Sequence, residues 1–213
     1  GGPTEYRGGR GRGFFGSGAT PANTRNLDRI WIATKGDGTD WGDDSVDGRQ
    51  EGNASFASST RGIWAGGADP AVYNNIQYIT IQTTGNAIDF GDLSVTSVRN
   101  ASTSNSKRGI VAISGNPSAN HSNILEFIEI ASAGNSTDFG DLGAIKGWPG
   151  RFSNCVRGGV YGGWTPSSPS RTNTIEYVNI ATTGNANDFG DTYSDGVNSG
   201  PGGCSDSGGG LTQ

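Results

Sequence analysis

The feature that most constrains this chain is an internal repeat. A tetrad of the form Asp-(Phe/Trp)-Gly-Asp occurs four times, at 40–43, 89–92, 138–141 and 188–191. Two further markers keep the same order: a hydrophobic run at 27–32, 76–81, 125–130 and 175–180, and an Arg-Gly step that starts at Arg12, Arg61, Arg108 and Arg157. Three markers that share one period of about 49 residues indicate tandem copies of one structural unit.

Each copy is typical of antiparallel β-structure. The hydrophobic run is rich in β-branched and aromatic residues over the length of a normal strand. It ends at a glycine followed by Asp or Asn, which supplies the positive φ of a tight turn. The tetrad then begins a second short strand whose ring is expected to point inward, and a polar Ser/Asn/Thr stretch such as 99–105 leads to the Arg-Gly strand. Sustained helical periodicity is absent, so we expect almost no helix.

The sequence therefore predicts an all-β fold in which four tandem antiparallel units of about 49 residues form a propeller-like or barrel-like ring. The expected organisation is a glycine- and arginine-rich N-terminal arm at 1–11, one domain at 12–207 and a partial fifth-unit strand at 208–213. Within the domain the four repeats are expected at 12–60, 61–107, 108–156 and 157–207.

Composition narrows the function. The longest apolar stretches fall far short of the ~20 residues of a membrane helix, so no membrane span is expected. The net charge of −5 and the pI near 4.8 argue against a general nucleic-acid binder, because neutralising phosphates needs a basic face. The basic run that contains Arg7, Arg10 and Arg12 resembles an RNA-binding Arg-Gly segment, and we interpret it as a flexible extension.

Several motifs carry a family resemblance. The glycine doublets, as in Arg-Gly-Ile-Trp-Ala-Gly-Gly at 61–67, resemble kelch units. Together with Gly-Asn-x-x-Asp-Phe-Gly-Asp and the glycine-rich run at 203–211, they also resemble tandem repeats of virion and tail-fibre proteins of marine bacteriophages, cyanophages especially. The resemblance covers nearly the whole chain from Arg12 onward. It implies a structural role outside the cell or on a virion, and it implies no catalysis.

The two ends of the chain overlap in repeat phase. Gly208–Leu211 falls in the phase of Arg157–Val160, yet the chain already contains this strand at Arg12–Phe15. Two interpretations stay open. Both ends complete one ring in neighbouring positions, or an end strand pairs with the open edge of another protomer, and this contact repeats head to tail. In the second interpretation the assembly residues are Arg12, Phe14, Phe15 and Leu211.

The ionisable residues indicate scaffold rather than catalysis. The single histidine, His121, lies in a polar stretch without a nucleophile-elbow pattern, and the sequence has no His/Cys cluster for zinc or iron. We therefore predict no enzyme activity, no catalytic residue and no cofactor. The tetrad carboxylates are either turn caps or weak calcium ligands. The calcium candidates are Asp89, Asp92, Asp138, Asp141, Asp188 and Asp191.

Other residues recur in phase. The arginines at the Arg-Gly steps match Asp43, Asp92, Asp141 and Asp191 in number, which predicts a repeated Arg–carboxylate contact, with unrelated surface charges as the alternative. The structural repeat set is Arg61, Arg108 and Arg157 with the rings Trp41, Phe90, Phe139 and Phe189. Cys155 and Cys204 occupy nearly equivalent positions, either as a disulfide between units or as free thiols.

Aromatic residues outside the repeat pattern are the candidates for binding. Tyr73, Trp148, Trp164 and Tyr193 fall in Gly/Pro/Ser-rich stretches, where they either stack on sugars or pack over a sheet end. Taken together, the sequence predicts a non-enzymatic extracellular or virion structural subunit that self-assembles into a fibre or appendage. The alternative is a receptor- or glycan-binding propeller module of a phage tail fibre, with host-surface glycans as partners.

Overall fold

A computed structural model describes residues 11–19, 23–45, 53–68, 71–115, 121–167, 170–194 and 203. All regular elements among these residues are β-strands, arranged in four separate antiparallel sheets. The all-β prediction is confirmed, and the sheets are separate blades of a propeller-like fold rather than staves of one barrel. In the part of the chain described here, no helical segment has the length and hydropathy to cross a membrane.

The blades follow the chain in order. The first blade is β1 (Arg12–Ala19), β2 (Asn23–Trp31) and β3 (Thr39–Asp43). The second is β4 (Ala54–Ala57), β5 (Arg61–Ala65), β6 (Asn75–Thr80) and β7 (Ile88–Asp92). The third is β8 (Ala101–Ser104), β9 (Arg108–Ala112), β10 (Ser122–Glu129) and β11 (Thr137–Lys146). The fourth is β12 (Gly150–Ser153), β13 (Arg157–Tyr161), β14 (Thr174–Asn179) and β15 (Asn187–Asp191).

Each four-stranded blade is a simple meander in which neighbours in sequence are neighbours in the sheet. The Arg-Gly strand is the second strand of the blade, the hydrophobic run is the third and the tetrad strand is the outer edge. Each blade thus begins one strand before the Arg-Gly step, so blades and sequence repeats are offset by one strand. The described part of the first blade has three strands, and β1 takes the position of β5, β9 and β13.

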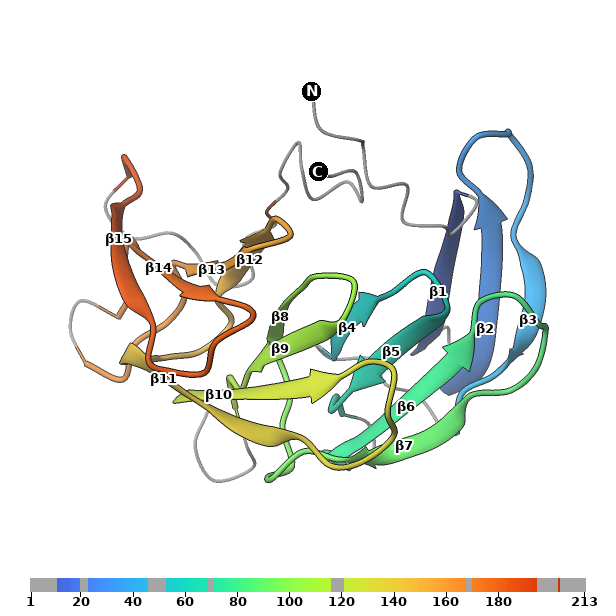
Figure 1. The fold of residues 1–213 in the computed structure, drawn as a ribbon, viewed down its shortest axis with the longest axis horizontal. Helices are drawn as coiled ribbons and strands as arrows, with labels where there is room; N and C mark the ends of the chain where they lie inside the picture. The colour runs from blue at the N-terminus through green and yellow to red at the C-terminus, as the bar shows by residue number, and fades with distance from the viewer. Residues whose placement is uncertain are drawn as a thin grey trace.

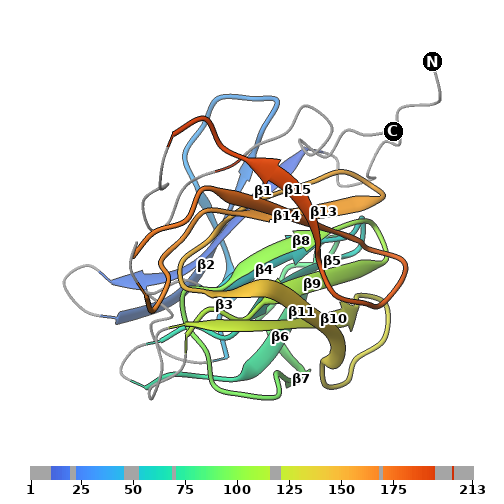
Figure 2. The same ribbon diagram turned by 90° about the vertical axis from the view of Figure 1, so that its left-hand side faces the viewer.

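The blades lie side by side along an arc (Figure 1), with β1–β3 at one end and β12–β15 at the other. Their short first strands are central: β4 and β12 both pack against β8. In Figure 2, which turns the fourth blade toward the viewer, β14 and β15 lie in front of the other blades. The first and fourth blades are therefore the two terminal blades of the described arc.

The hydrophobic core lies between blades rather than within them. One buried cluster joins Leu27 and Trp41 of the first blade to Trp64 and Ile79 of the second. A second cluster joins the second and third blades, and a third joins the third and fourth blades. Because a blade is a single sheet, it must bury both faces against its neighbours. We call each of these three blade-to-blade contacts a seam.

Candidate functional site

The outer strand of each blade forms main-chain hydrogen bonds to the turn of the next blade. At the first seam the N–H of Gly85 donates to the carbonyl of Trp41 at 3.0 Å, and Ala87 donates to Asp43 at 2.8 Å. The amide of Asp43 donates to Oδ1 of Asn86 at 3.1 Å. The second seam repeats this pattern with Phe90, Asp92 and the turn at 134–136, and the third with Phe139, Asp141 and the turn at 184–186.

The glycine of the tetrad is required by this close approach. Gly42, Gly91 and Gly140 have φ values of 146°, 148° and 141°, a conformation that favours glycine. A Cβ atom at these positions would lie 2.4–2.6 Å from the backbone of Gly85, Gly134 and Gly184 of the next blade. The first aspartate acts locally, since Oδ1 of Asp40 accepts the amide of Gly42 at 3.1 Å.

The arginines of the first three Arg-Gly steps also cross the seams. The guanidinium of Arg61 lies 4.5 Å from the Tyr78 ring of its own blade and donates to the carbonyl of Ile130 in the next blade at 2.9 Å. Arg12 donates to the carbonyl of Ile81. Arg108 stacks 4.2 Å from the Phe127 ring and donates to Ile180 at 3.2 Å. Each arginine thus combines a cation–π contact with a charged hydrogen bond across the seam.

These acceptors correct the prediction of a repeated Arg–carboxylate contact. The inter-blade partners of Arg12, Arg61 and Arg108 are main-chain carbonyls rather than Asp43, Asp92 or Asp141. Arg108 does bind a carboxylate, but it is Glu129 of its own blade, 2.8 Å from Nε. The tetrad carboxylates are instead exposed at all eight positions, as turn-capping groups are.

From the second blade onward, the third strand of each blade supplies a buried polar side chain to the blade before it. Oε1 of Gln77 accepts the amide of Ser45 at 2.9 Å. Glu126, in the same position one blade later, accepts the amide of Ser94 at 3.3 Å and the hydroxyl of Ser136 at 2.5 Å. Gln77 and Glu126 are 0% and 2% exposed, so their hydrogen bonds offset a large desolvation cost.

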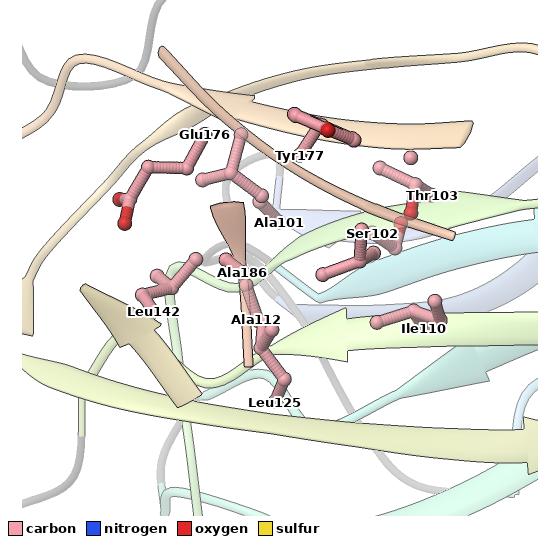
Figure 3. Close-up of a pocket in the computed structure, with 13 residues that line it drawn as sticks. Ala101, Ser102, Thr103, Ile110, Ala112, Leu125, Leu142, Glu176, Tyr177 and Ala186 are labelled. Atoms are coloured by element: carbon pink, nitrogen blue, oxygen red, sulfur yellow. The ribbon is translucent and has the colours of Figure 1, made fainter. Parts of the chain in front are cut away.

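The third seam keeps this pattern and adds an ion pair. Glu176 accepts the amide of Gly143 at 2.5 Å, and Nζ of Lys146 lies 2.5 Å from its Oε2. Lys146 is fully buried and also donates to Oγ1 of Thr174 at 2.7 Å. Figure 3 shows the narrow space beside Glu176, where Ser102 and Thr103 of the third blade lie near Tyr177 of the fourth. Its volume is about 10 Å³, the size of one water site, so it is a packing gap rather than a ligand pocket.

We call the outward face of the fourth blade the trailing face. It has the same tetrad ring, tetrad glycine and Arg-Gly arginine as the seams, but no other blade packs against it among the described residues. Phe189 is 55% exposed, whereas Trp41, Phe90 and Phe139 are 4%, 4% and 2% exposed. A Cβ atom on Gly190 would meet nothing within 4 Å. Arg157 stacks on Tyr177 at 4.7 Å, as its counterparts do on their rings, yet its side chain is exposed.

The outward face of the first blade, the leading face, is the complement. Ile32 is 68% exposed, whereas the equivalent Ile81, Ile130 and Ile180 are 6%, 1% and 0% exposed. Asp28, in the position of Gln77 and Glu126, is exposed, and a Cβ atom on Gly36 of the turn would meet no described residue within 4 Å. The leading face therefore presents the groups that receive a trailing face at the three seams.

The predicted assembly residues divide between these environments. Arg12 and Phe14 belong to β1, which pairs with β2 of its own sheet. This strand is therefore part of its own blade, which corrects the expectation that it is donated to another protomer. The Phe14 ring contacts Trp41 of its own chain, with centroids 5.0 Å apart. Phe15 is 56% exposed on the leading face. Leu211, the segment 208–213 and residues 1–10 of the arm lie outside the described residues.

The remaining candidates form no reactive centre among the described residues. That part of the chain contains no group of three or more His, Cys, Asp and Glu residues placed to hold a metal. Cys155 is a free, half-buried thiol, and Cys204 lies outside the described residues. Tyr73 is half-buried and Tyr193 fully exposed, whereas Trp148 and Trp164 line a common cleft with His121.

Sequence reasoning missed the turn as a functional element. Asn86, Asn135 and Asn185 follow the predicted turn glycines at one constant position, and that recurrence was the available signal. Because each accepts a main-chain amide of the preceding blade, they define the direction in which blades stack.

Comparisons with known proteins support the fold. No protein-family model matches the chain, and no curated protein matches it. A solved structure described as "Structure of YjhT" is similar, with a TM-score of 0.64 and 10% sequence identity over 85% of this chain. The chain covers 66% of the length of that protein. At this identity the likeness concerns the fold alone: the chain is an all-β, propeller-like protein of four described blades.

Proposed function

We propose that the chain is a non-enzymatic structural subunit that assembles head to tail, with the trailing face of one copy docking on the leading face of the next. The observation that carries the proposal is the exposure of Phe189, whose three counterparts are buried in seams. The new contact repeats the existing seams. Phe189 and Asp191 offer their main-chain groups to the Gly36–Asp37 turn, and Arg157 reaches the carbonyl of Ile32.

The two faces differ from each other, so the contact is heterologous. A heterologous contact gives a closed ring when the rotation closes and an open filament when it does not. Beside β1, among the described residues, the position held by β4, β8 and β12 in the other blades is empty, and it provides a free strand edge for an incoming segment. The resemblance to virion and tail-fibre repeats is consistent with an extracellular or virion-borne assembly.

Two charge variants test the direction of docking. Phe189→Asp blocks the trailing face and Ile32→Asp blocks the leading face, while Ile145→Asp changes an exposed apolar residue that belongs to neither face. Each blocked variant alone should remain monomeric in sedimentation velocity. A mixture of the two should form dimers and nothing longer, because only one intact pair of faces remains. Ile145→Asp should assemble like the parent chain.

Several outcomes would contradict the proposal. A parent chain that stays monomeric up to high concentration would show that the terminal blades close on each other or remain apart. A mixture that forms no dimer, or a Phe189→Asp variant that still elongates, would show that assembly uses other surfaces.

A further inference from the structure

A cleft is lined by residues of the loops and connections around the third and fourth blades. The described residues that line it are Arg99, His121, Gly147, Trp148 and Trp164, and its volume is about 290 Å³. This volume is at the lower end of small-molecule sites, about 300–1,000 Å³. Arg99 lies between β7 and β8, Trp148 between β11 and β12, and Trp164 after β13. The third and fourth blades and the connections that lead into them therefore form the cleft.

Two side chains of the cleft are held on an unusual backbone. Arg99 and Trp148 have φ values of 66° and 51°, and they are the non-glycine residues with positive φ in the described part of the chain. They occupy equivalent positions, directly before Asn100 and Pro149 at the start of the blade's first strand, where the first copy of the repeat has Gly52. A left-handed conformation costs a side chain about 1–2 kcal/mol. Such strain is found preferentially at ligand sites.

The two strained residues form one surface. The guanidinium of Arg99 lies 4.4 Å from the centroid of the Trp148 ring, and the amide of Trp164 donates to the carbonyl of Gly147 at 2.7 Å, which fixes the second indole beside the first. Trp164 is 38% exposed. The Nε1–H of Trp148 is buried and has no hydrogen-bond partner among the described residues. The cleft thus combines indole surface, a donor without an acceptor and a cation.

The charge of the cleft defines its ligand. Its described lining includes Arg99 and His121 and no carboxylate, and Arg171 lies 5.5 Å from the Trp164 ring. The whole chain carries a net charge of −5, so the two arginines are a local exception. A guanidinium binds a carboxylate strongly, and the apolar C–H face of a sugar ring packs on indole. We propose that the cleft binds uronic-acid oligosaccharides. Nucleic acid is disfavoured because it requires an extended basic face.

The test uses tetragalacturonate and a hyaluronan tetrasaccharide, each compared with its neutral methyl ester, in titrations followed by tryptophan fluorescence and confirmed by saturation-transfer NMR. The acids should bind at least about tenfold more tightly than their esters, because the ester loses the charged hydrogen bond. Arg99→Gly removes the cation and also relieves the strained backbone, so loss of binding cannot be attributed to misfolding. It should abolish the preference for the acid, so that acid and ester bind with equal affinity.

Trp164→Ala should weaken acid and ester together, because both lose the stacking surface. Trp31→Ala is the matched control, since Trp31 is also an exposed indole beside an arginine, 4.9 Å from Arg29, but lies outside the cleft. Its binding should equal that of the parent chain. Equal affinity for acid and ester, an unchanged Arg99→Gly variant, binding of oligo-dT or poly-glutamate as tight as that of the acids, or no binding of either acid would each overturn the proposal.

Discussion

Truncating the tetrad ring should have opposite consequences in a seam and on the trailing face. An aromatic side chain buries about 150–250 Å² when enclosed. Phe90 is 4% exposed and Phe189 is 55% exposed, so Phe90 has about twice as much of its surface removed from water. At about 25 cal/mol per Å², the two rings contribute about 5 and about 2 kcal/mol to the folded monomer. These figures are upper estimates, because the unfolded chain already buries some surface.

We therefore expect Phe90→Ala to lower the free energy of unfolding of the dilute monomer by about 3–5 kcal/mol and Phe189→Ala by about 2 kcal/mol or less. Urea denaturation followed by tryptophan fluorescence, at a concentration where the chain is monomeric, measures the difference. Equal losses for the two variants would refute the reasoning, because they would mean that Phe189 is enclosed in the monomer.

The association of copies should show the converse. Docking would remove from water the half of the Phe189 ring that is now exposed, roughly 100 Å² or about 2.5 kcal/mol. Phe189→Ala should therefore weaken self-association by about 60-fold, measured by sedimentation across a concentration series. A self-association constant that does not change in Phe189→Ala would remove this ring from the interface.

Three further comparisons use the repeat as its own control. Arg61→Met should cost about 2–4 kcal/mol of stability, because it loses a cation–π contact and a charged hydrogen bond. Arg157→Met, at an exposed position, should cost less than about 1 kcal/mol. Similar losses for the two variants in thermal unfolding would argue against the seam contact. Gly91→Ala should destabilise the chain far more than Gly190→Ala in urea denaturation, because both strain a positive φ but only the first drives a Cβ atom into the Gly134 backbone. Lys146→Met should cost about 3–5 kcal/mol by leaving Glu176 buried without its cation, and adding Glu176→Gln should recover much of this loss; a double variant no more stable than the single one would mean that the pair is not the cause.

Much of the fold could be predicted because the repeat shows which segments recur as strands and turns. The hydrophobic runs are the third strands, the Gly-Asx steps are turns, and Trp41, Phe90 and Phe139 point inward as expected. Phe189 has the same local sequence and yet is exposed, because burial depends on the neighbouring blade rather than on the tetrad. The sequence pattern alone therefore predicts the strand, but it does not predict whether another blade packs against that strand.

Two elements were beyond sequence reasoning for physical reasons. The stretch 99–105 reads as a polar connection, but it contains β8, whose Ser and Thr residues are buried because blades pack on both sides of this central strand. The hydrogen-bond acceptors of the Arg-Gly arginines were also missed. Every residue has a main-chain carbonyl like that of Ile130, so no residue type in the sequence identifies which carbonyl is the acceptor. Pairing by counting charges therefore favoured the aspartates.

The location of the core between blades also determines which parts of the molecule should unfold first. When apolar contacts join only adjacent modules, stability becomes a sum of intrinsic and nearest-neighbour terms, as in a one-dimensional chain of coupled units. The second and third blades each have two coupled neighbours, and the terminal blades have one. Amide hydrogen exchange should therefore be fastest in β15 and β1 and slowest around β8. Adding a copy at either end should slow exchange in the blade that it covers.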